Sequence, residues 1–295
     1  MTQLKKIRIV SLNITIQPHT PDMYVDLLRK AFKLKKPVRL RGSDYGMIGS
    51  LKYNPESETV TGDIYKFLSI DLTKPWFNSK KLQKAEDEDL EELNIPDNLK
   101  PNLETFGYIF YPQGHHLFVE TYSGGNTIGP QQLKRLFDIL LSSPEILATY
   151  GHVDVTIEPT AESLDQILKI PSLSRLTIRV TRPNPDDLDD LEEEVFSRMD
   201  EEHVSKEERV LTGIRGQSIE PSEATIKLAR VAASNGYVKG HGQGVDNNPI
   251  EISTVKHPYI AEAVYDADVQ LGSSVFYQEA ESMWSSIKRR MRRNR

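Results

Sequence analysis

The chain contains no cysteine among its 295 residues. This absence excludes disulfides, thiolate zinc sites and cysteine nucleophiles, and it is typical of a reducing compartment. No apolar run approaches the roughly 18 residues of a membrane-spanning helix. After Lys5 and Lys6 the sequence alternates like a strand, whereas a signal peptide needs an unbroken apolar stretch. We therefore expect a cytoplasmic protein with no membrane insertion of its own.

Linear catalytic motifs are also missing. The sequence has no Asp/Glu-x-Lys pair for a magnesium-dependent nuclease and no Gly-x-Ser-x-Gly nucleophile turn. The segment 124–130 has the position of a phosphate loop, but Pro130 and Gln131 stand where the Lys-Ser/Thr pair is required. A turn followed by a helix cap explains it better. We expect no catalytic residues, no metal and no cofactor, and the question of enzymatic activity stays open.

A cryptic metal site is an alternative. His115 and His116 are adjacent in a predicted hairpin, so their side chains point to opposite faces. His152 and Asp154 share one strand face, and Glu120 is the third ligand that such a site would need.

Apolar periodicity predicts an α+β fold with mixed or antiparallel sheets, hairpins, packed helices and a long C-terminal helix. Strands are expected at 4–16, 44–53, 58–68, 105–111, 116–122, 152–158, 175–181, 237–240, 250–255 and 259–265. Helices are expected at 21–35, 130–142, 161–169, 186–208, 222–234 and 273–293, with an exposed excursion at 79–92. We expect three regions: 1–103 with a basic helix, 104–210 ending in an acidic helix, and 217–295 with a basic terminal helix.

The charge is unevenly distributed, although the net charge is only −6. Residues 1–41 contain ten Lys/Arg and two Asp, a net charge of +8. Residues 186–208 contain twelve acids and two bases, a net charge of −10, and residues 288–295 contain six bases and no acid. Such segregation favours electrostatic partners of opposite sign at different surfaces.

The two basic ends supply the candidate DNA-binding residues: Lys30, Lys33, Lys35, Lys36, Arg39, Arg41, Lys288, Arg289, Arg290, Arg292 and Arg293. The segment 39–49 is either a tight turn into a strand or a cradle of backbone and arginine groups for a phosphate. The basic tail is a solvated helix end, a nucleic-acid patch, or a surface that docks on an acidic partner, including the chain's own residues 186–208.

A homodimer is expected from the terminal helix. It carries one apolar stripe with few obvious local partners: Phe276, Trp284, Ile287 and Met291. Symmetric dimers commonly cover such a stripe.

Several stretches carry a family resemblance: RGSDY at 41–45, TGDIYKF at 61–67, NIPDNLKPN at 94–102, TRPNPDD at 181–187 and ARVAASNG at 229–236. Together they resemble the bacterial domain-of-unknown-function 4747 family, which implies a bacterial or prophage origin and transfers no catalytic residues. The 106–120 hairpin, residues 126–129, the strand–helix–strand middle and the charged terminal helix are also similar in outline to lambda RexA-like phage-exclusion proteins. That resemblance implies a DNA-binding dimer that works with a membrane partner in phage defence.

These observations lead to three functional hypotheses. The first is a non-enzymatic, sequence-nonspecific DNA-binding component of a bacterial or prophage anti-phage defence system. The second is a regulator or complex subunit that docks through its acidic and basic helices, with the product of a neighbouring gene, such as a membrane protein, as partner. The third is a nuclease or toxin-like enzyme with a cryptic site.

Overall fold

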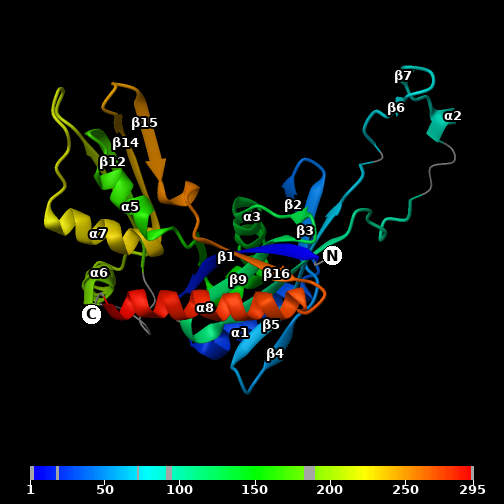
Figure 1. Ribbon diagram of the computed structural model, residues 1–295, viewed down its shortest axis with the longest axis horizontal. Helices are drawn as coiled ribbons and strands as arrows, with labels where there is room; N and C mark the ends of the chain where they lie inside the picture. The colour runs from blue at the N-terminus through cyan, green and yellow to red at the C-terminus, as the bar shows by residue number, and fades with distance from the viewer. Residues whose placement is uncertain (1–2, 18–19, 72, 91–94, 183–189, 294–295) are drawn as a thin grey trace.

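The computed structural model describes residues 3–17, 20–71, 73–90, 95–182 and 190–293. An antiparallel ten-stranded sheet forms the centre of the molecule (Figure 1), in the order β11-β1-β9-β8-β5-β3-β2, with β16 on β1, β10 on β9 and β4 on β5. Its strands are β1 (Leu4–Ile16), β2 (Val38–Arg41), β3 (Asp44–Ile48), β4 (Lys52–Asn54), β5 (Thr59–Leu68), β8 (Glu104–Tyr111), β9 (His116–Ser123), β10 (Asn126–Thr127), β11 (Val153–Ile157) and β16 (Ile260–Asp266). This first sheet takes strands from all three expected regions, and the predicted α+β class is confirmed.

The long strand β1 sets the two faces of the first sheet. Its residues alternate in direction, so Leu12 and Ile14 contribute to the larger core while Ile7 and Ile9 contribute to a separate apolar cluster on the other face. The larger core lies under three helices: α1 (Pro21–Lys33), α3 (Pro130–Leu141) and α4 (Pro144–Tyr150). The predicted start of α1 is confirmed, because Thr20 Oγ1 accepts a hydrogen bond from the backbone N–H of Met23 at 3.3 Å.

The terminal helix α8 (Gly272–Arg293) packs on the opposite face of this sheet. Phe276, Trp284 and Ile287 are no more than 7% exposed, and they contact the apolar side chains of β1, β8 and β9. The expectation of an uncovered apolar stripe is therefore wrong for these three residues; the side chain of Met291 lies outside the described residues. The sheet of the same chain covers the stripe, which removes this argument for a dimer.

A second antiparallel sheet has the order β13-β12-β14-β15. Its strands are β12 (Ser172–Thr181), β13 (Lys206–Thr212), β14 (Gly236–Gln243) and β15 (Pro249–Ser253). One face packs against α5 (Ala161–Leu168), α6 (Asp190–Glu201) and α7 (Glu223–Ser234), and this packing buries an apolar cluster of its own.

Two sequence predictions fail at this second sheet. The expected helix 186–208 is shorter in the structure, because α6 ends at Glu201. Residues 206–212 instead form β13, which pairs in register with β12 from Lys206 opposite Thr181 to Thr212 opposite Arg175. Residues 183–189 lie outside the described residues. The expected strand–helix–strand unit is also divided. Its first strand, β11, pairs with β1 in the first sheet, and its second strand belongs to the second sheet.

The described residues between β5 and β8 (69–71, 73–90 and 95–103) form an arm that projects away from both sheets (Figure 1). The arm carries the short strands β6 (Phe77–Asn78) and β7 (Gln83–Lys84) and the short helix α2 (Asp87–Leu90). Its base is fixed where the backbone N–H of Ser69 donates to Ser43 O and that of Leu68 donates to Pro101 O, each at 2.9 Å. Residues 79–90 of the excursion predicted at 79–92 lie within this arm, and residues 91–92 lie outside the described residues.

Candidate nucleic-acid interface

Most of the predicted N-terminal cations lie exposed at one edge of the first sheet. Lys33 ends α1, and the next residues lead into β2, the edge strand of the sheet. Arg135 of α3 joins them, because its Nε donates a hydrogen bond to the backbone oxygen of Arg39 at 2.8 Å. We call the following set the basic patch: Lys33, Lys35, Lys36, Arg39, Arg41 and Arg135.

The alternation of β2 explains why its arginines face outward. Val38 and Leu40 are buried in the larger core, so Arg39 and Arg41 point to solvent. Lys30 differs from the patch residues. Its ammonium group hydrogen-bonds Thr149 Oγ1 and lies 5.7 Å from the ring centroid of Tyr150, so it is already engaged.

No acidic side chain forms an ion pair with the basic patch within the described part of the chain. Cations elsewhere are commonly paired. Arg8 Nε lies 2.6 Å from Glu262 Oε2, and Lys239 Nζ and Lys256 Nζ lie 3.2 and 2.8 Å from Glu251 Oε1. The positive charge of the patch is therefore not neutralised locally, which leaves it available to an anionic partner.

The segment at 39–44 is a tight hairpin turn. Arg39 Nε donates to Gly42 O at 2.7 Å, and Gly42 has a φ of +55°, which glycine adopts without strain. Arg41 is paired in register with Asp44 across the turn. The interpretation of this segment as a tight turn into a strand is confirmed. Phosphate binding by the turn stays a prediction.

The C-terminal cations lie on α8, which packs on the face of the first sheet opposite to the face that α1 covers. Lys288 Nζ lies 5.1 Å from the ring centroid of Trp284. Arg289 donates to Ser285 O and to Ser286 Oγ, both at 3.3 Å. The side chains of Arg290, Arg292 and Arg293 lie outside the described residues.

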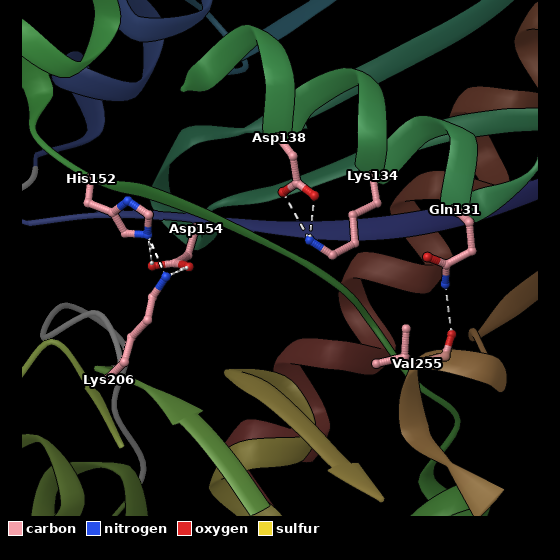
Figure 2. A network of polar contacts seen from close by, with 7 residues as sticks. All are labelled: Gln131, Lys134, Asp138, His152, Asp154, Lys206 and Val255. Carbon is pink, nitrogen blue, oxygen red and sulfur yellow. Dashed lines mark hydrogen bonds and ion pairs between the residues drawn. The ribbon is translucent and has the colours of Figure 1, made fainter. Parts of the chain in front are cut away.

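The alternative three-ligand metal site is not formed. His152 Nε2 lies 3.2 Å from Asp154 Oδ2, but the other carboxylate oxygen is 2.7 Å from Lys206 Nζ (Figure 2), so an ammonium group takes the place of a metal. Glu120 pairs with Ile9 and Asp154 pairs with Thr15, six residues further along β1, or roughly 20 Å at about 3.3 Å per residue. No three His, Asp or Glu side chains among the described residues gather around a point that could hold a metal ion.

A buried polar cluster that the sequence did not reveal lies where β1, β9 and the end of β11 meet. Ser11, Asn13, His116 and Glu158 are all 8% exposed or less. His116 Nε2 lies 3.8 Å from Glu158 Oε2, and Ser11 Oγ and Asn13 Oδ1 have no hydrogen-bond partner among the described atoms. A His–Glu pair is chemically suited to general acid–base work, yet a phosphodiester does not reach side chains closed off in this way.

A family model described as a domain of unknown function (DUF4747) matches residues 5–281. No curated protein matches the chain. None of the described helices combines the length and apolar character that a membrane crossing requires.

Proposed function

The chain belongs to the DUF4747 family, a domain of unknown function, and from that premise we propose that it is a non-enzymatic, sequence-nonspecific DNA-binding component of a bacterial or prophage anti-phage defence system. The basic patch carries this proposal, because its exposed Lys and Arg side chains have no ion-pair partner within the described residues. Cations that neutralise DNA phosphates release condensed counterions, and this release drives binding without reference to sequence.

The overall charge decides where DNA can bind. A net charge of −6 repels a polyanion on average, so attraction must come from a local surface of opposite sign. The basic patch is such a surface, and the C-terminal cations of α8 are proposed as a second contact. The sequence carries no finger or recognition-helix motif, which favours backbone contact over base readout.

Charge reversal at the patch tests DNA binding directly. The variant Lys35→Glu/Lys36→Glu/Arg41→Glu changes exposed side chains and leaves Arg39 and Arg135 in place to hold the turn. If the wild type makes about six phosphate contacts, raising salt from 50 to 200 mM should weaken binding roughly a thousandfold. With about three contacts left, the same change should cost only roughly fortyfold. Fluorescence anisotropy on unrelated duplexes measures both slopes.

A matched control separates the patch from a general charge effect. Lys169→Glu/Arg175→Glu/Arg230→Glu makes the same change in net charge on exposed residues of the second sheet and its helices. It should keep most of the wild-type salt slope. If the intact protein shifts no duplex at 50 mM salt, DNA binding is rejected and the docking-subunit hypothesis takes its place.

The role in defence is tested in cells. The gene should lower phage plating when it is expressed with its neighbours, and Lys35→Glu/Lys36→Glu/Arg41→Glu should restore plating at equal protein level. Equal plating with and without the gene, over a broad phage panel, would reject the defence role and leave DNA binding untouched.

Docking on a protein is the second candidate, favoured by the exposed acids of α6. Glu193, Glu194 and Glu201 are exposed and have no ion-pair partner within the described residues. Glu193→Lys/Glu194→Lys should abolish capture of a basic neighbouring-gene product in a binding assay if this surface docks it. Unchanged capture by the variant would exclude α6 as the docking surface.

A further inference from the structure

The arm at 69–103 is held together by its own polar contacts. Asp89 accepts hydrogen bonds from Asn78 Nδ2 and Lys81 Nζ, both at 2.9 Å, and from the backbone N–H of Glu86 at 3.0 Å. These contacts lower the pKa of Asp89 to about 2, the Lys81 hydrogen bond contributing most. The tip is therefore a preformed unit, although it projects away from the body (Figure 1).

The arm nevertheless exposes large apolar side chains. Phe77, Leu82, Leu99 and Leu103 are between 58% and 78% exposed, and none belongs to a described core cluster. These side chains offer apolar area on one projecting segment to a partner molecule. We call these four residues the arm face.

A second exposed apolar set lies on the body. Leu4, Val264, Val269 and Leu271 are between 65% and 79% exposed. The start of β1 is tied to the chain after β16, because the backbone N–H of Ala267 donates to Gln3 O at 3.0 Å and that of Gln3 donates to Asp268 Oδ2 at 3.3 Å. We call this set the β16 patch; β16 itself is an edge strand that pairs only with β1 in the described structure.

The arm and the β16 patch lie at the same end of the first sheet. Leu4 pairs with Asp266, so β1 begins where β16 ends. The arm leaves from the end of β5 and returns at the start of β8, which the Lys66–Glu104 pairing places together. The tip of the arm, with β6, β7 and α2, lies away from this end of the sheet (Figure 1), where a second molecule can meet it.

We propose that the chain binds a second copy of itself by exchanging arms, so that each arm face covers the β16 patch of the other copy. Both apolar surfaces are present in one chain, and a two-fold axis beside this end of the sheet satisfies both at once. Sixteen apolar side chains then leave water, which amounts to on the order of 1,000 Å² at about 60–100 Å² each. Polar residues around these side chains add to the buried area and bring the total into the range of stable interfaces, about 1,200–2,000 Å².

Because the chain contains no cysteine, disulfide crosslinking between introduced cysteines tests arm exchange without interference from native thiols. Phe77→Cys and Val264→Cys are prepared as separate variants, mixed and oxidised mildly. A covalent dimer should form in the mixture, and Phe77→Cys mixed with Val245→Cys, an exposed residue of the turn between β14 and β15, should give far less. If the two pairs crosslink equally, or if a double Phe77→Cys/Val264→Cys variant closes within one chain at low concentration, the proposal is overturned.

Light scattering gives an independent readout that requires no DNA. The wild type should be a dimer at tens of micromolar, and Phe77→Ser/Leu82→Ser should be a monomer with an unchanged far-UV spectrum. The control Ile214→Ser/Val245→Ser, which removes equally exposed apolar groups elsewhere, should stay dimeric. A monomeric wild type, or a dimeric arm variant, would refute arm exchange whatever the DNA experiments show.

Discussion

At the scale of single residues, Glu120 is a buried carboxyl group. It lies on β9, and its Oε2 accepts a hydrogen bond from the backbone N–H of Gly107 at 2.9 Å. Burial raises the pKa of Glu120, and the nearby Asp63 adds to this, while the Gly107 hydrogen bond opposes it. The folded state therefore holds the proton more tightly than the unfolded chain, whose ordinary value is 4.5.

The pH dependence of this residue has a definite sign. A raised folded pKa means that the stability contribution is complete below 4.5 and is lost as pH rises through the folded pKa. Glu120→Gln cannot ionise, so its melting temperature should exceed that of the wild type increasingly from pH 4 to pH 7. As control, Glu262→Gln should show a small difference of opposite sign, because Lys6 and Arg8 lower the pKa of Glu262. A Glu120→Gln difference that does not vary with pH would contradict this account.

At the scale of elements, α8 is fixed to the sheet by a glycine in the short 3₁₀ turn between β8 and β9. The Trp284 ring lies directly on Gly114, where an added Cβ would fall only 1.8 Å from a ring carbon. Trp284 also stacks on Tyr111, with ring centroids 5.5 Å apart. The close approach of helix and turn therefore depends on the absence of a side chain at residue 114.

Gly114→Ala should consequently loosen the contact between α8 and the sheet. Overpacking of this kind typically costs about 1–3 kcal/mol of unfolding free energy. Gly129→Ala is the matched control, because its Cβ would meet only Gln132 Oε1 at an ordinary 3.5 Å. Urea unfolding followed by Trp fluorescence measures both. Combining Gly114→Ala with Trp284→Phe should recover part of the loss, and a Gly114→Ala protein as stable as the wild type would refute the packing argument.

At the scale of the whole molecule, a few polar contacts join two sheets that have separate apolar cores. Lys206 of β13 pairs with Asp154 of β11, and Gln131 Nε2 of α3 donates to Val255 O at 3.0 Å (Figure 2). Asn13 Nδ2 also donates to Ser234 O at 3.5 Å. The relative placement of the sheets thus depends on partly buried polar groups more than on a shared core.

Lys206→Met should weaken this junction by about 1 kcal/mol, since it leaves Asp154 without its ammonium partner. The urea unfolding transition of this variant should become broader or split into two steps, because the two sheets unfold less cooperatively. Lys256→Met, which breaks an ion pair with Glu251 on the second-sheet side alone, should leave the transition single. A single sharp transition in both variants would show that the junction does not depend on Lys206.

The sequence alone determined the parts of this protein that depend on neighbouring residues. The alternation of β1, the Thr20 cap of α1, the β8–β9 hairpin and the span of α3 followed from local periodicity and turn chemistry. These features depend on short-range geometry, which is written into adjacent residues. The family followed from the quoted stretches, which the family match confirms.

Only the tertiary structure decided what each surface meets. The local sequence pattern around Trp284 fits a dimer contact and packing on the sheet of the same chain equally well. In the structure, the first sheet of the same chain covers Trp284. The sequence predicts a helix at Lys206, but pairing with β12 makes it a strand residue beside Asp154. Arg135 belongs to the basic patch only because α3 packs on β2. Such outcomes depend on contacts between residues far apart in the chain, and these contacts carry no signature in the local sequence.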